Sequence, residues 1–352
     1  MELLLGAAAR TARGPQSVGA QHVGDEPLVT IVTPVLNRAQ RIQTCVSSVA
    51  RQSYPSVEHV VVDGGSTDGT IDVLREYEES SGLRWISEPD DGMYDAINKG
   101  LALARGRVLA YLNSDDFYLP WSVEVAMSAL ATGVDIVYGD LGILRFPAED
   151  ETRFSIQTYR PFDLSYYTYV GALGQPTVFW RSTVTEKIGG FDTRFQQAGD
   201  CEYWLRAAVS GATFSHVREV LAVQVDHEAT LRATRGDQLA AESAQLRRQY
   251  ASVARPPRQW AAPTLQQSLR FRRDRLQFMA ETLRRRPRRW RRFIGFLREH
   301  GIELMPPARA LESLLPSRMR RPTAMRVDMS PFEWALQELV GSRSRLRQPS
   351  AD

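Results

Sequence analysis

The sequence predicts an α/β fold in which a mostly parallel β-sheet carries helices on both faces. Short apolar runs at 28–35, 57–63 and 108–113 are typical of buried strands. Segments with helical periodicity, each of roughly ten residues, lie between these runs. Strands that are apolar along their whole length indicate a sheet covered on both sides. The chain is 43% hydrophobic and 24% charged, as expected for a globular domain.

Strands and helices alternate through the first 140 residues. The expected strands are 28–35, 57–63, 83–87, 108–113 and 135–140, and the expected helices are 38–51, 70–79, 94–104 and 121–131. Beyond residue 145 the alternation is irregular. There we expect strands at 176–181, 213–217 and 220–225, and a helix over 200–210 that begins with acidic residues.

Three regions follow from this pattern: a disordered leader at 1–26, the α/β domain at 27–232 and a helical, Arg-rich region at 233–352. The start of the chain carries Glu2 before a short apolar run, which differs from the basic start of a signal peptide. No apolar run approaches the roughly 20 residues of a membrane span. The cysteines are Cys45 and Cys201, which predicts no disulfide framework and suits a reducing cytoplasm.

Basic residues are almost all arginine. Of the 44 basic residues only Lys99 and Lys187 are lysine, so the other 42 are arginine. A GC-rich genome and phosphate recognition are both open as explanations. The segment 268–300 holds 12 arginines among Leu, Phe, Trp and Ile. Such a basic amphipathic segment could lie on an anionic membrane or pack as a helical appendage, and a net charge of +3 gives little support for nucleic-acid binding.

Acidic residues follow three of the predicted strands. Asp63 ends the second, Asp115 and Asp116 follow the fourth, and Asp140 ends the fifth. In open α/β sheets ligands bind outside the carboxyl ends of the strands. Each acid alone could belong to a turn. Together they predict a cation such as Mg²⁺ or Mn²⁺, which prefers oxygen ligands and completes its shell with substrate phosphate.

Two other nucleotide-binding designs are excluded. The first strand runs into Pro34-Val35-Leu36-Asn37-Arg38, without the Gly-x-Gly-x-x-Gly of a dinucleotide-binding domain. The glycines after the second strand have the wrong spacing for that motif, and the chain has no P-loop.

The segments VTIVTPVLNRAQRIQTCVSSVARQSYPSVEHVVVDGGSTDGT and EPDDGMYDAINKGLALARGRVLAYLNSDD resemble the nucleotide-sugar half of family 2 glycosyltransferases over about residues 28–230. The resemblance implies a GT-A fold for the domain at 27–232. It also implies an inverting, metal-dependent transfer from a nucleoside diphosphate sugar. UDP is the preferred donor nucleotide, with GDP and dTDP open. The second acid of the family's usual Asp-Asp-Gly-Ser is Gly64 here, in an Asp-Gly-Gly-Ser-Thr-Asp branch.

The resemblance also implies roles for individual residues. Asp63 would read the base or ribose, Asp115 would contact the ribose, and Asp116 would bind Mn²⁺ or Mg²⁺. His227 resembles a histidine that some relatives place near the metal. Relatives often carry a histidine where this chain has Gln175. The full donor set implied is Thr33, Pro34, Asn37, Asp63, Gly65, Ser66, Asp91, Asp95, Asn98 and Asp115.

The segment 189–211 matches the family's pattern for the catalytic base. We assign Asp200 to that role, with Glu202 as the second candidate. A positioned carboxylate can take the proton of an acceptor hydroxyl. The competing interpretation is that Asp200 only caps the following helix.

The reaction expected is sugar transfer to a glycan or lipid-linked acceptor in the cell envelope, by a cytoplasmic enzyme that could bind the inner face of the membrane. Two other functions stay open. A sugar nucleotidyltransferase should carry a Gly-rich basic loop after the first strand, which the sequence lacks. A non-catalytic nucleotide-sugar-binding or membrane assembly protein is disfavoured, though not excluded, by the acids at 115, 116 and 200.

Overall fold

The computed structural model describes residues 26–145, 153–170, 173–226, 236–253 and 303–304. The helices are α1 (Ile42–Ala50), α2 (Thr70–Ser81), α3 (Met93–Leu103), α4 (Ser122–Leu130), α5 (Leu164–Val170), α6 (Ser182–Ile188), α7 (Gly199–Val209) and α9 (Gly236–Tyr250). The strands are β1 (Val29–Val35), β2 (Val57–Asp63), β3 (Arg84–Ser87), β4 (Val108–Tyr111), β5 (Phe117–Tyr118), β6 (Ile136–Arg145), β7 (Arg153–Gln157), β8 (Phe179–Arg181), β9 (Phe214–Asp226) and β10 (Glu303–Leu304).

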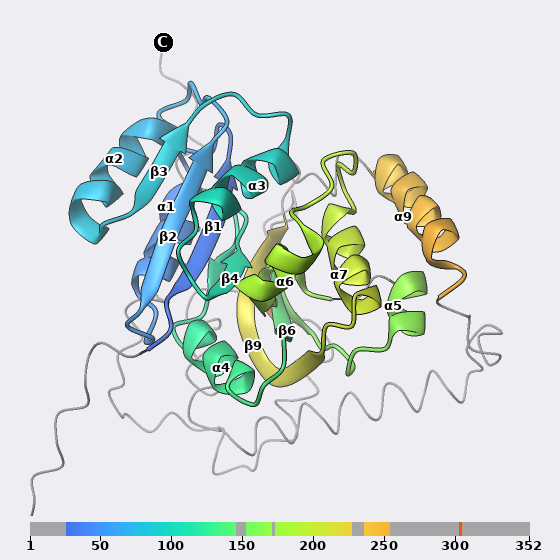
Figure 1. The fold of residues 1–352 in the computed structure, drawn as a ribbon. Coiled ribbons are helices and arrows are strands. Elements are labelled where there is room, and N and C mark those ends of the chain that lie inside the picture. Colours follow the sequence, from blue (N-terminus) through green and yellow to red (C-terminus); the bar gives the residue numbers. More distant parts are fainter. Residues whose placement is uncertain (1–25, 146–152, 171–172, 227–235, 254–302, 305–352) are drawn as a thin grey trace, which may run out of the picture.

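One sheet runs through the described part of the chain in the order β10-β7-β6-β8-β4-β1-β2-β3 (Figure 1). Strands β1 to β4 pair in parallel, so their carboxyl ends meet at one edge. From β8 onward the sheet is mixed, since β8 is antiparallel to both β4 and β6 while β9 is parallel to β6. The α/β fold with a largely parallel sheet, predicted from the sequence, is confirmed.

Helices α1 and α3 cover opposite faces of β1. The hydroxyl of Thr33 lies 3.6 Å from the sulfur of Cys45 in α1. A Cβ added to Gly100 in α3 would lie 2.3 Å from Val32 Cγ1. Because Val32 and Thr33 are consecutive in a strand, their side chains point to opposite faces. The sheet is therefore buried from both sides, which explains why its strands are apolar throughout.

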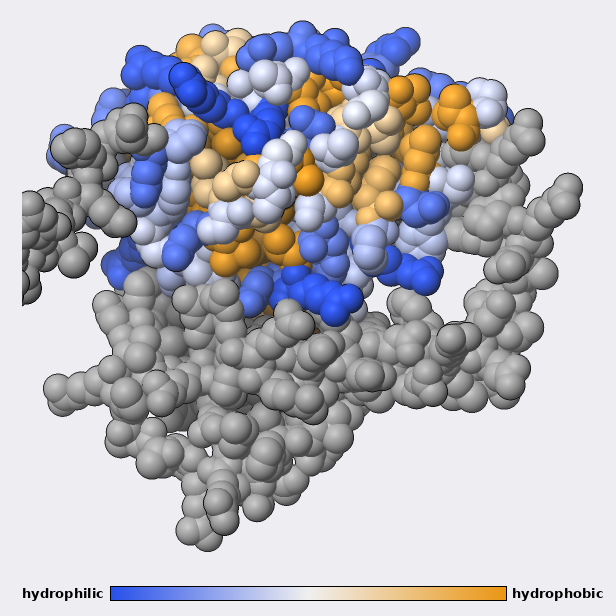
Figure 2. Space-filling model, turned by 60° about the horizontal axis from the view of Figure 1, so that its bottom comes forward, coloured by the Kyte–Doolittle hydropathy of each residue, from blue (hydrophilic) through white to orange (hydrophobic). Residues whose placement is uncertain are grey.

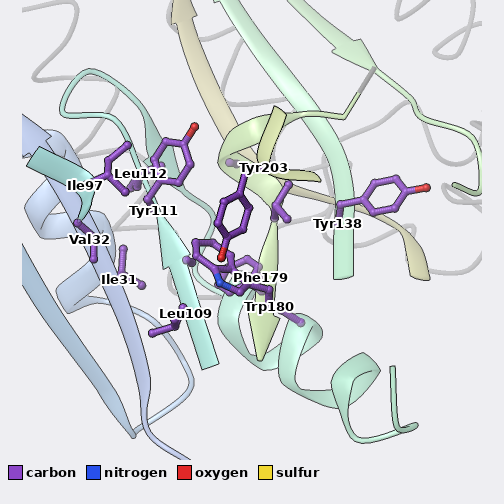
Figure 3. Packing of buried hydrophobic residues seen from close by; sticks show 14 of the residues in the cluster. Ile31, Val32, Ile97, Leu109, Tyr111, Leu112, Tyr138, Phe179, Trp180 and Tyr203 are labelled. Atoms are coloured by element: carbon purple, nitrogen blue, oxygen red, sulfur yellow. The ribbon is translucent and has the colours of Figure 1, made fainter. Parts of the chain in front are cut away.

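The core continues from the parallel strands into an aromatic cluster under α7. Figure 3 shows Ile97 of α3 beside Val32 and Leu112, and Tyr203 of α7 over Phe179 and Trp180 of β8. The rings of Trp180 and Tyr203 are 5.9 Å apart, edge to face. This packing joins α7 to the sheet, so the start of α7 has a fixed place relative to the strand ends.

Some elements differ from the sequence prediction. The runs 213–217 and 220–225 are one strand, β9, with register shifts where it passes Tyr138 and Asp140 of β6. The first residues of the strand expected at 176–181 form a 3₁₀ turn, Gln175–Thr177. Strand β7 and helices α5 and α6 were not predicted, because their short segments lack a clear period.

Helix α9 lies beyond residue 232, where the sequence suggested a domain boundary. It packs beside α5 and α7, on the side away from β1, β2 and β3 (Figure 1). Leu246 and Tyr250 belong to the main core. The leader at 1–26 is described only at residue 26, and the basic segment 268–300 lies outside the described residues. The three domain limits stay predictions.

Apolar side chains reach the surface of the described part in several places. Figure 2 shows hydrophobic residues reaching the surface between hydrophilic ones. The large apolar side chains exposed there are Leu36, Val209 and Val253, which belong to different segments. Single exposed apolar residues of this kind are common in globular proteins. Within the described residues, every helix is too short or too polar to cross a bilayer.

Candidate active site

The carboxylate of Asp63 organises the loop that follows β2. Asp63 is fully buried, and its Oδ2 accepts hydrogen bonds from the N–H groups of Gly65 (3.1 Å) and Ser66 (2.9 Å) and from the Ser87 hydroxyl (2.7 Å). Its other oxygen, Oδ1, is buried without a hydrogen-bond partner among the described residues. Burying a carboxylate oxygen without a hydrogen bond costs free energy. This oxygen therefore marks a place where a ligand could donate a hydrogen bond.

Asn37 ties the loop after β1 to the loop after β2. Its main-chain N–H donates to Ser66 Oγ at 2.7 Å, and its Oδ1 accepts from the N–H of Thr67 at 2.8 Å. Asn37 has φ of 52°, a left-handed conformation that Asn tolerates better than most residues. Both loops are therefore held as one surface at the carboxyl edge of the sheet.

Gly64 stands where the family often has a second acid, and a neighbouring carboxylate takes up the space beside it. A Cβ at Gly64 would lie 2.4 Å from Asp90 Oδ2 and 3.5 Å from Leu36 Cδ1. The other oxygen of Asp90 accepts the N–H of Gly92 at 2.9 Å, which fixes the side chain. A negative charge is thus present next to Gly64, supplied by the turn before α3.

Asp116 is a second deeply buried acid at this edge. It is 2% exposed; Oδ1 accepts the N–H of Val225 at 3.0 Å, and Oδ2 accepts from the Asn113 amide at 3.4 Å. Burial first, and the adjacent Asp115 second, raise the pKa of Asp116 well above its ordinary value. Arg41, at the start of α1, is close enough to Asp115 for the two side chains to attract each other electrostatically. The Asn113 amide also contacts Gln175 Oε1 at 3.3 Å.

These residues fit a divalent cation that keeps most of its ligands as water and phosphate. Among the described residues no three His, Cys, Asp or Glu side chains converge as a metal cage. Asp116 is nevertheless a buried acid beside a second acid, and the neighbouring Asn113 Oδ1 is buried without a partner in the described part. Oxygen ligands and one or two carboxylates are what Mg²⁺ and Mn²⁺ use in such sites. His227 lies outside the described residues.

Asp200 lies at the start of α7, in contact with Tyr94 of α3. The Tyr94 hydroxyl donates to Asp200 Oδ1 at 3.4 Å and accepts the main-chain N–H of Asp200 at 3.1 Å. The N–H of Cys201 donates to the same carboxylate oxygen at 2.8 Å. Burial raises the pKa of Asp200, and the hydrogen bonds from Cys201 and Tyr94 oppose that rise. A partly desolvated carboxylate of this kind suits a general base.

An aromatic cluster connects Asp200 with the strand-end acids. Phe191 stacks on Tyr94 with ring centres 5.6 Å apart, and it meets the edge of Tyr111 at 5.4 Å. Tyr111 is the last residue of β4, four residues before Asp115. The charge of Asp200 raises the pKa of the Tyr111 phenol, second only to burial. Asp200 therefore belongs to the same end of the molecule as the carboxyl ends of the parallel strands.

Glu202 faces another direction. Its Oε2 binds Arg206 Nη2 at 2.8 Å, and its Oε1 accepts from Arg206 Nε at 2.9 Å and from the Tyr250 hydroxyl at 3.2 Å. The residue is 3% exposed. Two residues along a helix turn the side chain by about 200°. Glu202 thus joins α7 to α9, and this placement favours Asp200 over Glu202 as the candidate base.

Asp200 does not cap α7. The N-cap position is Ala198, which has no side-chain cap, and the main-chain donor that the Asp200 carboxylate accepts is the N–H of Cys201, the next residue. The competing interpretation, in which Asp200 is the N-cap of this helix, is therefore wrong. The N–H groups ahead of α7 are bound by a residue of α9 instead.

Several candidate donor residues are used by the protein itself. Thr33 is buried and its hydroxyl lies 2.9 Å from His59 Nε2. Asn98 exchanges two hydrogen bonds with the main chain of Phe191, at 2.8 and 2.7 Å. Asp95 accepts the N–H of Asp91 at 3.1 Å and lies 3.4 Å from Lys99 Nζ.

The side chains of Thr33 and Asn98 therefore support the loops around the site, and Asp95 stabilises the start of α3. The strand-end residues Asp63, Ser66, Asn37, Asp115 and Asp116 are those that the structure gathers at one edge. Pro34 is the second-last residue of β1 at that edge, and Gly65 has φ of +90° with open space where a Cβ would lie.

Sequence reasoning missed Asp90, Tyr94, Arg41 and Gln175. Tyr94 and Asp90 lie in the segment EPDDGMYDAINKG. Their position in this acidic turn was the one feature of the sequence that could have indicated a place in the site. At Gln175 the sequence indicated only that a histidine often present in relatives is absent. Arg41 gave no signal, because one arginine among 42 cannot be told from the rest by sequence.

The fold and the strand-end acids define an α/β scaffold with an acidic edge suited to ligand binding, and comparison with known proteins names the family. The family model described as glycosyl transferase family 2 matches residues 30–176. A PGL/p-HBAD biosynthesis glycosyltransferase of Mycobacterium bovis is 30% identical over 200 residues, 55% of this chain and 75% of the relative. An uncharacterized glycosyltransferase of Mycobacterium tuberculosis is 37% identical over 188 residues, 52% of this chain and 70% of the relative. The chain belongs to glycosyl transferase family 2.

Solved structures confirm the fold alone. The mannosyltransferase PcManGT of Pyrobaculum calidifontis, in complex with GDP-Man and Mn²⁺, has a TM-score of 0.51 at 23% identity over 66% of this chain and 65% of that one. TarS 1–349 of S. aureus, in complex with UDP-GlcNAc, has a TM-score of 0.50 at 14% identity over 90% of this chain and 89% of that one. The fold of this chain is the GT-A fold, as the sequence resemblance implied.

Proposed function

We propose that this chain transfers a sugar from a nucleoside diphosphate sugar to a hydroxyl of a glycan or lipid-linked acceptor, with inversion at the anomeric carbon. One observation carries the proposal. Two groups of acids with different environments lie at one end of the sheet: the strand-end acids Asp63, Asp115 and Asp116, and the separately held Asp200. One group suits a nucleotide diphosphate and the other suits proton removal.

The nucleoside end of the donor is placed at Asp63. Its unpaired Oδ1 can accept a hydrogen bond from a base N–H or a ribose hydroxyl, and its Oδ2 already holds the loop in shape. Asp90 adds a second carboxylate beside Gly64. We favour UDP as the nucleotide, with GDP and dTDP as the other candidates.

The diphosphate end is placed at Asp115 and Asp116. Asp116, helped by Asp115 and the Asn113 oxygen, would hold Mn²⁺ or Mg²⁺. When bound, such an ion supplies Lewis-acid stabilisation of the negative charge that develops on the leaving diphosphate. The chain's own part is to hold the Asp116 carboxylate in a buried place, where it accepts hydrogen bonds from the N–H of Val225 and the amide of Asn113.

Asp200 removes the proton of the acceptor hydroxyl. The hydroxyl oxygen then forms a bond to the anomeric carbon from the face opposite the diphosphate, and the bond from that carbon to the phosphate oxygen breaks. Its electrons leave with the nucleoside diphosphate, and the proton stays on Asp200 until it passes to water. A raised pKa strengthens Asp200 as a base while Tyr94 and Cys201 keep it oriented.

The acceptor class is inferred from the relatives. A relative named for PGL/p-HBAD biosynthesis supports a glycolipid or related cell-envelope acceptor for this chain. Such an acceptor would be met at a membrane surface. Association of a cytoplasmic enzyme with the inner face through 268–300 stays a prediction, since that segment lies outside the described residues.

Calorimetric titration of the full chain with UDP, GDP and dTDP tests the donor site. We expect one nucleotide to bind in Mn²⁺ or Mg²⁺ and to lose most of its affinity in EDTA, because the buried acids otherwise repel the diphosphate. Binding that is equal in EDTA would contradict the metal's role. If all three nucleotides fail to bind, and the corresponding UDP-, GDP- and dTDP-sugars also fail, the donor-site proposal is wrong.

Tyr94→Phe is expected to move the acid limb of the pH–rate profile to higher pH. The Tyr94 hydroxyl donates to Asp200 and so favours its ionised form, which is the active base. Removing the donor raises the pKa of Asp200 further, so activity is lost sooner as the pH falls. Turnover is measured as nucleoside diphosphate release with n-octyl glycosides as acceptors. Tyr203→Phe, which loses a hydroxyl that bonds to Thr185 and not to Asp200, should leave the limb in place.

A further inference from the structure

The carboxylate of Glu242 in α9 binds the main chain that leads into α7. Its Oε1 accepts the N–H of Gln196 at 3.0 Å, and its Oε2 accepts the N–H groups of Gln197 at 2.9 Å and Ala198 at 2.8 Å. Glu242 is buried, and the Gln238 amide donates to its Oε1 at 3.0 Å. One side chain from 44 residues away thus receives three consecutive backbone donors.

In the part of the chain that the structure describes, these three N–H groups donate to Glu242 and to no other acceptor. Helix α7 has Ala198 at its N-cap and no capping side chain of its own. Ala198 is the N-cap, whose N–H has no partner within the helix, and Gln196 and Gln197 lie directly before it. Glu242 accepts all three N–H groups from a different helix, and its negative charge at the start of α7 is favourable because of the helix dipole. The segment 196–198 therefore depends on α9 for its conformation.

The same segment ends directly before the candidate base. Gly199 follows Ala198 and lies against the ring of Tyr94, so close that an added Cβ would be 2.6 Å from the ring. Asp200 comes next and is bonded to the Tyr94 hydroxyl. The main chain from 196 to 200 is consequently held between Glu242 on one side and Tyr94 on the other.

We infer that Glu242 is a positioning residue for the transfer reaction: it fixes the loop that aims Asp200 at the acceptor hydroxyl. The inference rests on the proposed function, in which Asp200 is the base. It also means that α9, outside the part of the chain matched by the family model at 30–176, is needed for catalysis. A shift of about 1 Å at a reacting group can cost on the order of 100-fold in rate.

The test compares Glu242→Gln with Tyr250→Phe in the full chain. Gln keeps the size of the side chain but replaces one accepting oxygen by an NH₂ group that cannot accept the backbone donors. Tyr250→Phe removes another buried contact between α9 and α7, the bond to Glu202, without touching 196–198. It serves as the control for a general loss of packing between the two helices.

Nucleoside diphosphate release with n-octyl glycosides gives kcat, and nucleotide titration gives donor affinity. We expect Glu242→Gln to lower kcat by about 10-fold to 100-fold with donor affinity within about twofold of wild type. We expect Tyr250→Phe to lower the melting temperature comparably, with kcat within about twofold. Equal kcat in the two variants, at equal folded fraction, would overturn the inference.

Two further results keep the outcomes apart. If Glu242→Gln does not fold, Gln238→Ala is used, because it removes a hydrogen bond to Glu242 without removing the charge of Glu242. We expect Gln238→Ala to lower kcat as well. An unchanged kcat would count against the inference. If wild type binds a nucleotide but releases no diphosphate with any acceptor or water, the proposed function fails before Glu242 is tested. If wild type transfers sugar and Glu242→Gln is fully active, the proposed role of Glu242 is wrong and the proposed function still holds.

Discussion

Replacing Asp116 by Asn is expected to remove metal-dependent donor binding and to lower turnover by at least about 100-fold, since Lewis-acid stabilisation of a leaving group is worth several kcal/mol. Asp116 is the buried acid of the pair, and burial first and the charge of Asp115 second raise its pKa, which a bound cation would oppose. Asn has the same shape but no charge. It can therefore keep the fold while losing the ligand.

The structure indicates why this variant should fold. The Asn oxygen can still accept the N–H of Val225, as Asp116 Oδ1 does at 3.0 Å. The new NH₂ group would face Asn113, whose Oδ1 is buried without a partner in the described part of the chain. A rotation of the Asn113 amide would pair its Oδ1 with the new NH₂ group, at the loss of the 3.3 Å contact of the Asn113 amide with Gln175 Oε1. Burial of a neutral amide also costs less than burial of a carboxylate.

Calorimetry with the preferred nucleotide, in Mn²⁺ and in EDTA, measures the effect. Asp72→Asn is the matched control, because Asp72 is an exposed acid paired with Arg75 on α2. It should bind the nucleotide as wild type does. If Asp116→Asn bound the nucleotide with wild-type affinity, the metal would have to be held by other residues. If it lost binding and also had a lower melting temperature, the loss would be explained by a folding defect, and the role of Asp116 as a metal ligand would not be supported.

The strand-end acids could be predicted from the sequence because their signals are local. A buried parallel strand reads as an apolar run, and the acids that end it are its next residues, as with β2 and Asp63 or β4 and Asp115. The parallel register of β1, β2 and β4 then brings these ends together. For this half of the site, the chemistry follows from positions that are adjacent in the chain.

The surroundings of Asp200 could not be predicted in the same way. Tyr94 is 106 residues from Asp200, and Glu242 is 44 residues from Ala198. Both contacts depend on how α3, α7 and α9 pack, which a hydrophobic period does not specify. The continuous β9 escaped prediction for a related reason, since its register shifts interrupt the pattern where it passes Asp140, which bonds to His216 at 2.9 Å.

Asp200→Asn is expected to abolish sugar transfer and to leave nucleotide affinity within about twofold of wild type. A general base contributes on the order of 100-fold to 10,000-fold to a rate. Asn keeps an oxygen that can accept the N–H of Cys201, which donates to Asp200 Oδ1 at 2.8 Å, so the loop geometry should persist. What Asn cannot do is take the acceptor's proton. The expected signature is therefore a loss in kcat alone.

Glu202→Gln is the variant that separates the two candidate bases. Glu202 bonds Arg206 and Tyr250, so its loss should lower the melting temperature by leaving Arg206 with a weaker partner. It should not lower kcat for the folded protein, because the side chain does not face the Tyr94 side of α7. If instead Glu202→Gln abolished turnover while Asp200→Asn retained it, the base would be Glu202, and α7 would have to turn on binding donor and acceptor. Loss of nucleotide binding in Asp200→Asn with turnover retained would place Asp200 in the donor site, and the acceptor side would need another base.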